Sequence, residues 1–132
     1  MPARLPMTQK KRILVVDDQA SDSLLVKQCL EQTGDYEVLE INNVWTVSAR
    51  VEEFGPHLIL LDVRMPGIDG FELAASLHNQ PGMNAVPIVF MTALVTKTEV
   101  ESGNGRVGGF PVLAKPILLE DLVAEVKRHL GG

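Results

Sequence analysis

The chain has 132 residues, the length of one ordinary domain, and 45% of them are apolar, enough to fill a single hydrophobic core. A formal net charge of -5 argues against unassisted nucleic-acid binding, because proteins of that class present a basic surface. No apolar run approaches the roughly 18 residues that cross a bilayer, and the single cysteine, Cys29, excludes an internal disulfide and suits a cytoplasmic protein.

Three parts are expected along the chain. Residues 1–11 read as a disordered arm, because their basic residues are not followed by the apolar core of a secretory signal. Residues 12–130 form one domain, and residues 131–132 form a short tail.

The sequence of the first half of the domain predicts a strand, a helix, a second strand and a second helix. The unbroken apolar run at 13–16 is typical of a strand buried on both faces, and residues 37–41 are predicted to form a second strand. Between them lies a helical stripe that Gly34 is placed to end, formed by Leu25, Val26, Cys29 and Leu30. A second helical stripe, with Asn43 as its N-cap, consists of Val44, Val47, Val51 and Phe54. Trp45 and Tyr36 are expected to be packing residues.

The second half repeats the alternation. Strands are predicted at 58–61, 87–91 and 112–114. Asp69 and Glu72 resemble a capping box that opens a helix carrying Phe71, Ala74 and Ala75. The last helix has a stripe of Leu119, Leu122, Val123, Val126 and Leu130. Between residues 94 and 109 only a short, frayed or irregular fourth helix is expected, because four glycines follow its capping residues.

Strands that alternate with helices predict an α/β fold, a doubly wound parallel sheet with helices on both faces. Polar residues follow the strands where such sheets bind ligands, at the carboxyl ends of the strands. These residues are Asp17, Asp18, Asp62, Thr92 and Lys115.

This set of residues suits phosphoryl transfer. Crowded carboxylates repel one another unless a cation joins them, and oxygen ligands favour Mg²⁺ over zinc. A carboxylate can act as nucleophile and form an acyl phosphate, while Lys115 supplies positive charge and Thr92 a hydroxyl donor. Taken alone, an Asp after a strand is usually a turn residue or cap, and only the coincidence of all these residues favours the chemical interpretation.

The chain resembles the response-regulator receiver family of two-component signalling from about residue 13 to residue 130. The resemblance lies in four segments, 13–18 (ILVVDD), 58–70 (LILLDVRMPGIDG), 89–93 (VFMTA) and 114–116 (AKP). It implies a flavodoxin-like sheet of five parallel strands in the order 2-1-3-4-5.

The resemblance also implies a role for each site residue. Asp62 would accept the phosphoryl group, and Asp17 and Asp18 would hold Mg²⁺ together with Asp62 and the backbone carbonyl of Arg64. Thr92 would be the switch hydroxyl and Lys115 the phosphate-binding lysine.

The partners that the resemblance implies are a histidine kinase or histidine phosphotransfer protein as donor, and an effector protein or domain downstream. A weak homodimer is a further partner to test, whereas direct contact with nucleic acid or membrane is not expected. The protein would be a signalling switch that catalyses only its own phosphorylation and dephosphorylation.

The chain departs from the family pattern where many members have Tyr or Phe three residues before the lysine. Here that position is Val112, and the nearest aromatic residue is Phe110. An interaction module with atypical or no phosphorylation-dependent readout therefore stays open as an alternative. An aspartyl-phosphate phosphatase of the haloacid-dehalogenase type is disfavoured, because its second Asp would stand where this chain has Arg64.

Overall fold

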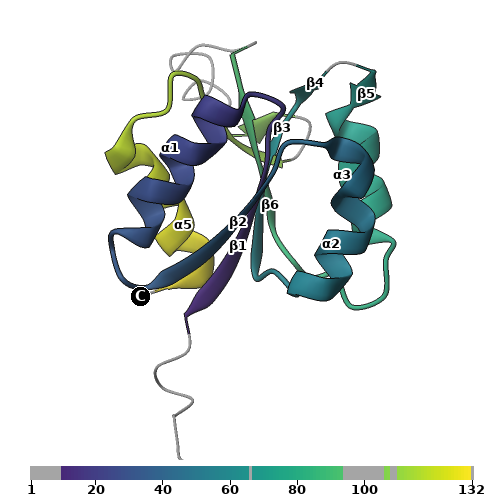
Figure 1. The fold of residues 1–132 in the computed structure, drawn as a ribbon, viewed down its shortest axis with the longest axis horizontal. Helices are drawn as coiled ribbons and strands as arrows, with labels where there is room; N and C mark the ends of the chain where they lie inside the picture. Colours follow the sequence, from purple (N-terminus) through teal and green to yellow (C-terminus); the bar gives the residue numbers. More distant parts are fainter. Residues whose placement is uncertain (1–9, 66, 94–105, 108–109, 132) are drawn as a thin grey trace, which may run out of the picture.

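The structure, a computed structural model, describes residues 10–65, 67–93, 106–107 and 110–131. One sheet with strand order β2-β1-β3-β6-β8-β7 lies at the centre, with α1 and α5 on one side and α2 and α3 on the other (Figure 1). The strands are β1 (Lys11–Val16), β2 (Tyr36–Ile41), β3 (Leu58–Asp62), β4 (Arg64–Met65), β5 (Ile68–Asp69), β6 (Ile88–Thr92), β7 (Arg106–Val107) and β8 (Phe110–Ala114). The helices are α1 (Ala20–Glu31), the 3₁₀ turn η2 (Val44–Thr46), α2 (Val47–Phe54), α3 (Gly70–His78) and α5 (Leu119–Leu130).

The five expected strands are present and parallel. They are β1, β2, β3, β6 and β8, and their neighbours in the sheet give the predicted order 2-1-3-4-5. The flavodoxin-like fold is therefore confirmed. The two-residue strand β7, which pairs antiparallel with β8, was not expected, because two residues are too few to show an alternating pattern.

Side chains of the central strands fill two cores, one on each face of the sheet. On β1, Leu14 and Val16 face the core under α2 and α3, whereas Ile13 and Val15 face the core under α1 and α5. All four are fully buried, which explains why the strand reads as an unbroken apolar run.

Three large apolar residues assigned to helix stripes are instead exposed. Leu25 on α1 is 54% exposed, Leu119 on α5 is 53% exposed, and Phe71 on α3 is 37% exposed. On α1 the inward face consists of Val26, Leu30 and a polar residue, Ser23, whose hydroxyl finds hydrogen-bond partners. A stripe chosen by hydrophobicity alone misses such a residue and rotates the predicted face.

The region before α2 also differs from expectation. Asn43 Oδ1 accepts a hydrogen bond from the backbone N–H of Trp45 at 3.0 Å, so Asn43 caps η2 and α2 begins only at Val47. The prediction that Trp45 packs inside is wrong, because its side chain is 76% exposed, whereas Tyr36 is buried as expected.

The start of α3 closes the loop that follows β3. Asp69 caps the helix as predicted, since its Oδ1 accepts a hydrogen bond from the Phe71 N–H at 2.8 Å. Gly70 touches the backbone of Val63 so closely that a Cβ atom there would lie 2.7 Å from the Val63 Cα atom. The residue after Asp62 is thereby held against the first turn of α3.

Two predictions concern segments beyond the described residues. The disordered arm falls almost entirely in residues 1–9. The irregular fourth helix was expected in residues 94–109, of which the structure describes only Arg106 and Val107, in β7. None of the helices in the described part of the chain has the length and apolar character that a membrane span requires.

Candidate functional site

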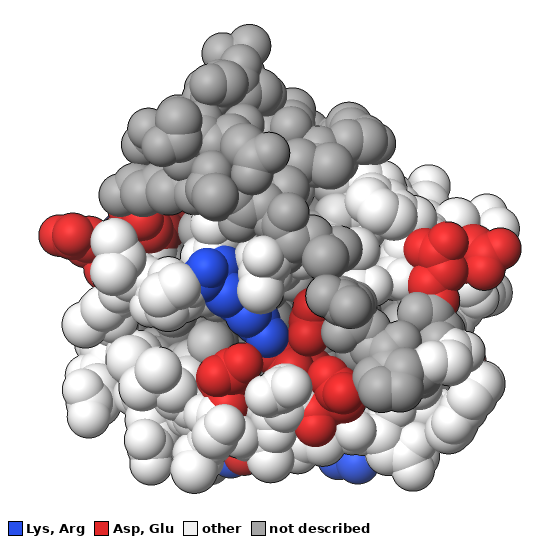
Figure 2. Space-filling view, turned by 90° about the horizontal axis from the view of Figure 1, so that it is seen from above, with Lys and Arg blue, Asp and Glu red and all other residues white. Residues whose placement is uncertain are grey.

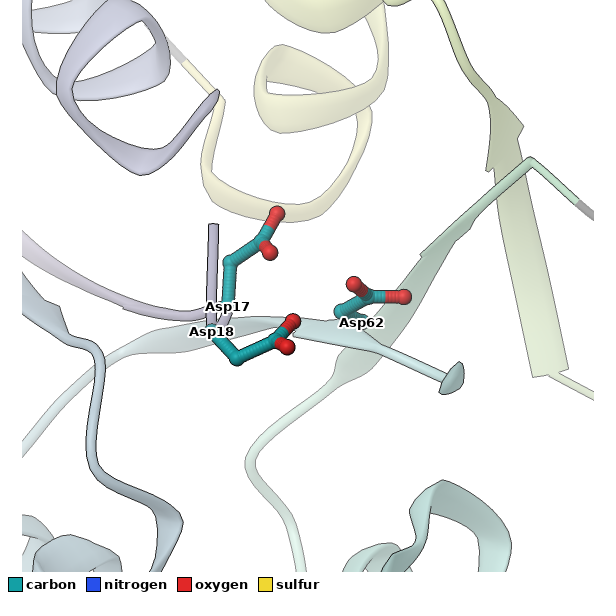
Figure 3. Close-up of side chains that lie close together, drawn as sticks. All are labelled: Asp17, Asp18 and Asp62. Carbon is teal, nitrogen blue, oxygen red and sulfur yellow. The ribbon is translucent and has the colours of Figure 1, made fainter. Parts of the chain in front are cut away.

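Three carboxylates meet at the carboxyl edge of the sheet. Asp17 and Asp18 directly follow β1, and Asp62 is the last residue of the adjacent strand β3. Their carboxylates lie close together at this edge (Figure 3), with one oxygen from each within 4.8 Å of the others. Asp17 and Asp62 are buried, whereas Asp18 is exposed to solvent.

Lys115 brings a positive charge into this group. Its Nζ atom donates to Asp17 Oδ2 at 2.8 Å and to Asp62 Oδ2 at 3.3 Å. The backbone N–H of Lys115 also donates to the carbonyl of Thr92 at 2.8 Å, which joins the ends of β8 and β6. The structure thus brings together the side chains of Asp17, Asp18, Asp62 and Lys115. The buried Thr92 lies at the end of β6, the strand that pairs with β3.

The electrostatics of the group favour a further cation. Burial disfavours a charged Lys115, but hydrogen bonds to Asp17 and Asp22 and the charges of Asp17 and Asp62 outweigh it and raise the lysine pKa above its usual value. One ammonium is still outnumbered by the carboxylates around it. The donor set consists of hard oxygen atoms, two of the carboxylates being buried, so it fits Mg²⁺.

A polar network that the sequence did not reveal holds Asp17 in place. Asn42 Nδ2 donates to the Asp17 carbonyl at 2.7 Å and to the Ser23 hydroxyl at 2.8 Å. The Ser23 hydroxyl lies 2.7 Å from Glu40 Oε2, to which it donates. On the other side, the Gln19 N–H donates to Asp17 Oδ1 at 2.9 Å. Asn42 follows β2 directly, and that place at a strand end was the one signal in the sequence.

A second missed residue is Asp22, in the first turn of α1. Its Oδ2 atom accepts a hydrogen bond from Lys115 Nζ at 3.1 Å. An acidic residue in a first helical turn is accounted for by the helix dipole alone, so no sequence pattern placed Asp22 in the site.

The group lines a cavity of about 820 Å³. In the view onto this edge of the molecule, several red acidic side chains gather beside the lower end of a blue basic one (Figure 2). The lining extends from the carboxylates onto apolar surface of α1 and of the segment after β8, and consists of Asp17, Asp18, Gln19, Asp22, Leu25, Val26, Asp62, Met91, Ala93, Lys115, Pro116 and Ile117.

Comparison with known proteins identifies this arrangement. Residues 13–127 match the response regulator receiver domain family. The chain belongs to that family. It is 36% identical over 120 residues to the phosphate regulon transcriptional regulatory protein PhoB of Pseudomonas aeruginosa, a match covering 91% of this chain and 52% of PhoB. It is 30% identical over 121 residues to protein PilH of the same organism, covering 92% of this chain and 98% of PilH.

Solved structures agree with the family assignment. The receiver has a TM-score of 0.77 and 27% identity to the chemotaxis protein CheY4 of Vibrio cholerae, covering 92% of this chain and 99% of CheY4. A response regulator from Chloroflexus aurantiacus gives a TM-score of 0.78 at 27% identity, and the match covers 94% of this chain and 100% of that regulator. The chain spans about half the length of relatives such as PhoB and the DNA-binding response regulator MtrA of Mycobacterium tuberculosis, and nearly all of PilH.

Two further residues of this receiver bear on its predicted roles. Arg64 lies in β4, whose backbone pairs with β5 at Asp69, and the role of its carbonyl as a metal ligand stays a prediction. Val112 is buried in the core beside Phe90. The nearby aromatic Phe110 packs edge-on against Phe90, with ring centroids 4.8 Å apart, so an aromatic side chain does occupy this part of the sheet.

Proposed function

We propose that this receiver accepts a phosphoryl group on Asp62 in a Mg²⁺-dependent reaction and acts as a cytoplasmic signalling switch. The donor is a phosphohistidine on a histidine kinase or a histidine phosphotransfer protein. One observation carries the proposal: the Asp62 carboxylate lies within 4.8 Å of two other carboxylates and 3.3 Å from the Lys115 ammonium.

The reaction follows from the side chains around Asp62. A carboxylate oxygen of Asp62 attacks phosphorus, and the phosphorus–nitrogen bond breaks with its electron pair passing to the imidazole of the donor. The Lys115 ammonium stabilises negative charge on a phosphoryl oxygen, and the Thr92 hydroxyl donates a hydrogen bond to another. Mg²⁺ held by Asp17, Asp18, Asp62 and the carbonyl of Arg64 would neutralise further charge on the phosphoryl group.

The switch acts through other molecules, because the group around Asp62 serves only its own phosphorylation and dephosphorylation. PhoB and MtrA are named as regulators of transcription or binders of DNA, and this chain matches about half of each. We infer that an effector protein or domain reads the phosphorylated receiver, and that this domain itself does not bind nucleic acid. A weak homodimer is a second form of readout to test.

One observation favours an alternative function. Val112 stands where many receivers have Tyr or Phe, and it is only 4% exposed in the core. A buried β-branched side chain cannot swing between two positions as an aromatic lever does. A module that binds its partner in the same way with and without phosphorylation would keep this fold.

The test is phosphorylation of purified protein by acetyl phosphate and Mg²⁺, followed by intact-mass measurement. Wild type is expected to gain one phosphoryl group, and Asp62→Asn none. Asp35→Asn, which changes an exposed carboxylate in the turn before β2, is the matched control and is expected to behave as wild type. Equal incorporation by Asp62→Asn would place the acceptor elsewhere. If the phosphorylated and the unphosphorylated receiver bind a partner with equal affinity, the alternative function is favoured.

A further inference from the structure

Asp22 is a fourth carboxylate at the site. It contacts Lys115 and is not one of the three carboxylates that could hold a metal ion. Its Oδ2 atom lies 3.1 Å from Lys115 Nζ. Within the described residues, the cluster able to hold an ion comprises Asp17, Asp18 and Asp62, so Asp22 stands outside it. Its side chain is 46% exposed, whereas that of Lys115 is 14% exposed.

The ammonium of Lys115 has three N–H donors, and three carboxylates surround it. The distances from Nζ are 2.8 Å to Asp17, 3.1 Å to Asp22 and 3.3 Å to Asp62. The contact with Asp22 is thus shorter than the contact with the proposed acceptor. A phosphoryl oxygen that needs an N–H group from Lys115 has to compete with a carboxylate for it.

We propose that Asp22 is a positioning residue that holds the Lys115 ammonium on the side of α1 and so restrains phosphorylation of the free receiver. The proposal rests on the proposed function of Asp62 and Lys115. When a phosphoryl group arrives, Lys115 turns from Asp22 toward it, and Asp22 remains solvated at the mouth of the cavity.

Competition outweighs any help that Asp22 gives in ordering Lys115. The shortest contact of the ammonium is with Asp17, which is 1% exposed and is itself held by Gln19, so Lys115 stays in place without Asp22. What Asp22 adds is one more acceptor and one more negative charge, both of which oppose an anionic donor.

The experiment compares Asp22→Asn and Asp22→Glu with wild type. It measures the acetyl phosphate concentration that gives half-maximal phosphorylation rate and the dissociation constant of Mg²⁺. For Asp22→Asn we expect the half-saturating concentration to fall about two- to fivefold, as suits a partly exposed ion pair. Mg²⁺ is expected to bind more weakly, because the cavity loses a negative charge. Opposite changes in the two constants separate this role from simple damage to the fold, which would weaken both.

Two controls sharpen the result. Asp22→Glu keeps the carboxylate and is expected to stay near wild type. Glu52→Gln removes one exposed charge from α2 and is expected to change neither constant. The effect of Asp22→Asn should persist at about 0.5 M salt, where long-range repulsion is screened but a direct contact is not.

A half-saturating concentration that is unchanged or raised in Asp22→Asn would overturn the proposal, as would an effect that vanishes in salt. Binding of inorganic phosphate in the presence of Mg²⁺, followed by the amide resonance of Lys115, separates it from the proposed function. Tighter phosphate binding by Asp22→Asn supports the restraint even if Asp62 is never phosphorylated. Normal phosphorylation of Asp62 with unchanged phosphate binding rejects the restraint alone.

Discussion

Asp18 is the exposed member of the three-carboxylate group, whereas Asp17 and Asp62 are buried. Replacing Asp18 with Ala therefore leaves no cavity, relieves repulsion between like charges and removes one proposed metal ligand. We expect the variant to fold with unchanged or higher stability in the absence of Mg²⁺ and to lose phosphorylation by acetyl phosphate.

Thermal unfolding with and without Mg²⁺ checks the Asp18→Ala prediction. At about ten times its dissociation constant, Mg²⁺ should add about 1.4 kcal/mol to the free energy of unfolding of wild type and little to that of the variant. Phosphorylation of Asp18→Ala at the wild-type rate would show that this carboxylate does not hold the metal.

His57 predicts a loss of stability in mild acid. Its Nδ1 atom accepts a hydrogen bond from the Arg12 backbone N–H at 2.9 Å, so Nδ1 carries no proton and the ring is neutral. Burial, followed by the charges of Arg12 and Lys11, lowers the pKa of His57 below its usual value near 6.5. The unfolded chain then binds a proton that the folded protein does not, so stability is constant above about pH 6.5 and falls as the pH drops below it.

The variant His57→Asn offers a test, because the Asn side-chain oxygen can replace Nδ1 as acceptor and does not titrate. Urea unfolding between pH 7.5 and 5 should show a smaller loss of stability on acidification than in wild type. The same pH dependence in both proteins would assign the acid sensitivity to other groups.

At the residue scale, the sequence predicted the site residues that follow the strands, but not the side-chain contacts between different elements. Asp17, Asp62 and Lys115 could be predicted, because the carboxyl ends of parallel strands share one edge. The contact of Asp22 with Lys115 joins residues 93 positions apart. No local pattern encodes such a contact, because the helix dipole alone already accounts for an acid in a first turn.

Among the elements, α3 depends on a close approach at its first residue. A Cβ atom on Gly70 would lie 2.7 Å from the Cα and 2.8 Å from the carbonyl oxygen of Val63, and neither backbone atom can rotate away. Gly70→Ala should lower the free energy of unfolding by about 1–3 kcal/mol, the usual cost of overpacking.

Chemical denaturation of Gly70→Ala checks this prediction. Ser76→Ala, an exposed change on the same helix, should stay within about 0.5 kcal/mol of wild type. Because Val63 follows Asp62, the Gly70 variant should also be phosphorylated more slowly under native conditions. Equal stabilities for the two variants would mean that the loop after β3 yields to the added methyl group.

Element type and order followed from the sequence because short strand-like segments, most of them unbroken apolar runs, alternate with helical stripes over most of the chain. The sequence predicted less well which helix residues face the core. Ser23 is buried on α1 because Asn42 and Glu40 satisfy its hydroxyl, whereas Leu25 is exposed. A stripe drawn from hydrophobicity prefers Leu25 to Ser23, since the partners of the hydroxyl lie on and after β2.

On the scale of the whole molecule, Leu25 sits where the proposed phosphohistidine protein would approach. Its side chain is 54% exposed and lines the same cavity as Asp62. A phosphohistidine that reaches Asp62 brings the surface of its protein over this part of α1, and the contact would bury Leu25. Acetyl phosphate is too small to do so.

Leu25→Asn should therefore slow transfer from a phosphohistidine protein about tenfold, the effect of losing about 1.4 kcal/mol of binding, and leave the rate with acetyl phosphate unchanged. The neighbouring Leu24→Asn is the control, because Leu24 is 44% exposed and does not line the cavity. Transfer rates that are equal for the two variants would place the donor on another face.

The position of Trp45 decides how this protein can be observed. It is the only tryptophan of the chain and is 76% exposed on η2, so its indole is already surrounded by water in the folded state. Its emission should lie at long wavelength and change little when the chain unfolds, which makes intrinsic fluorescence a poor monitor of stability and circular dichroism a better one. For the same reason, a blue shift of that emission on mixing with a tryptophan-free protein would report contact at the start of α2 without any label.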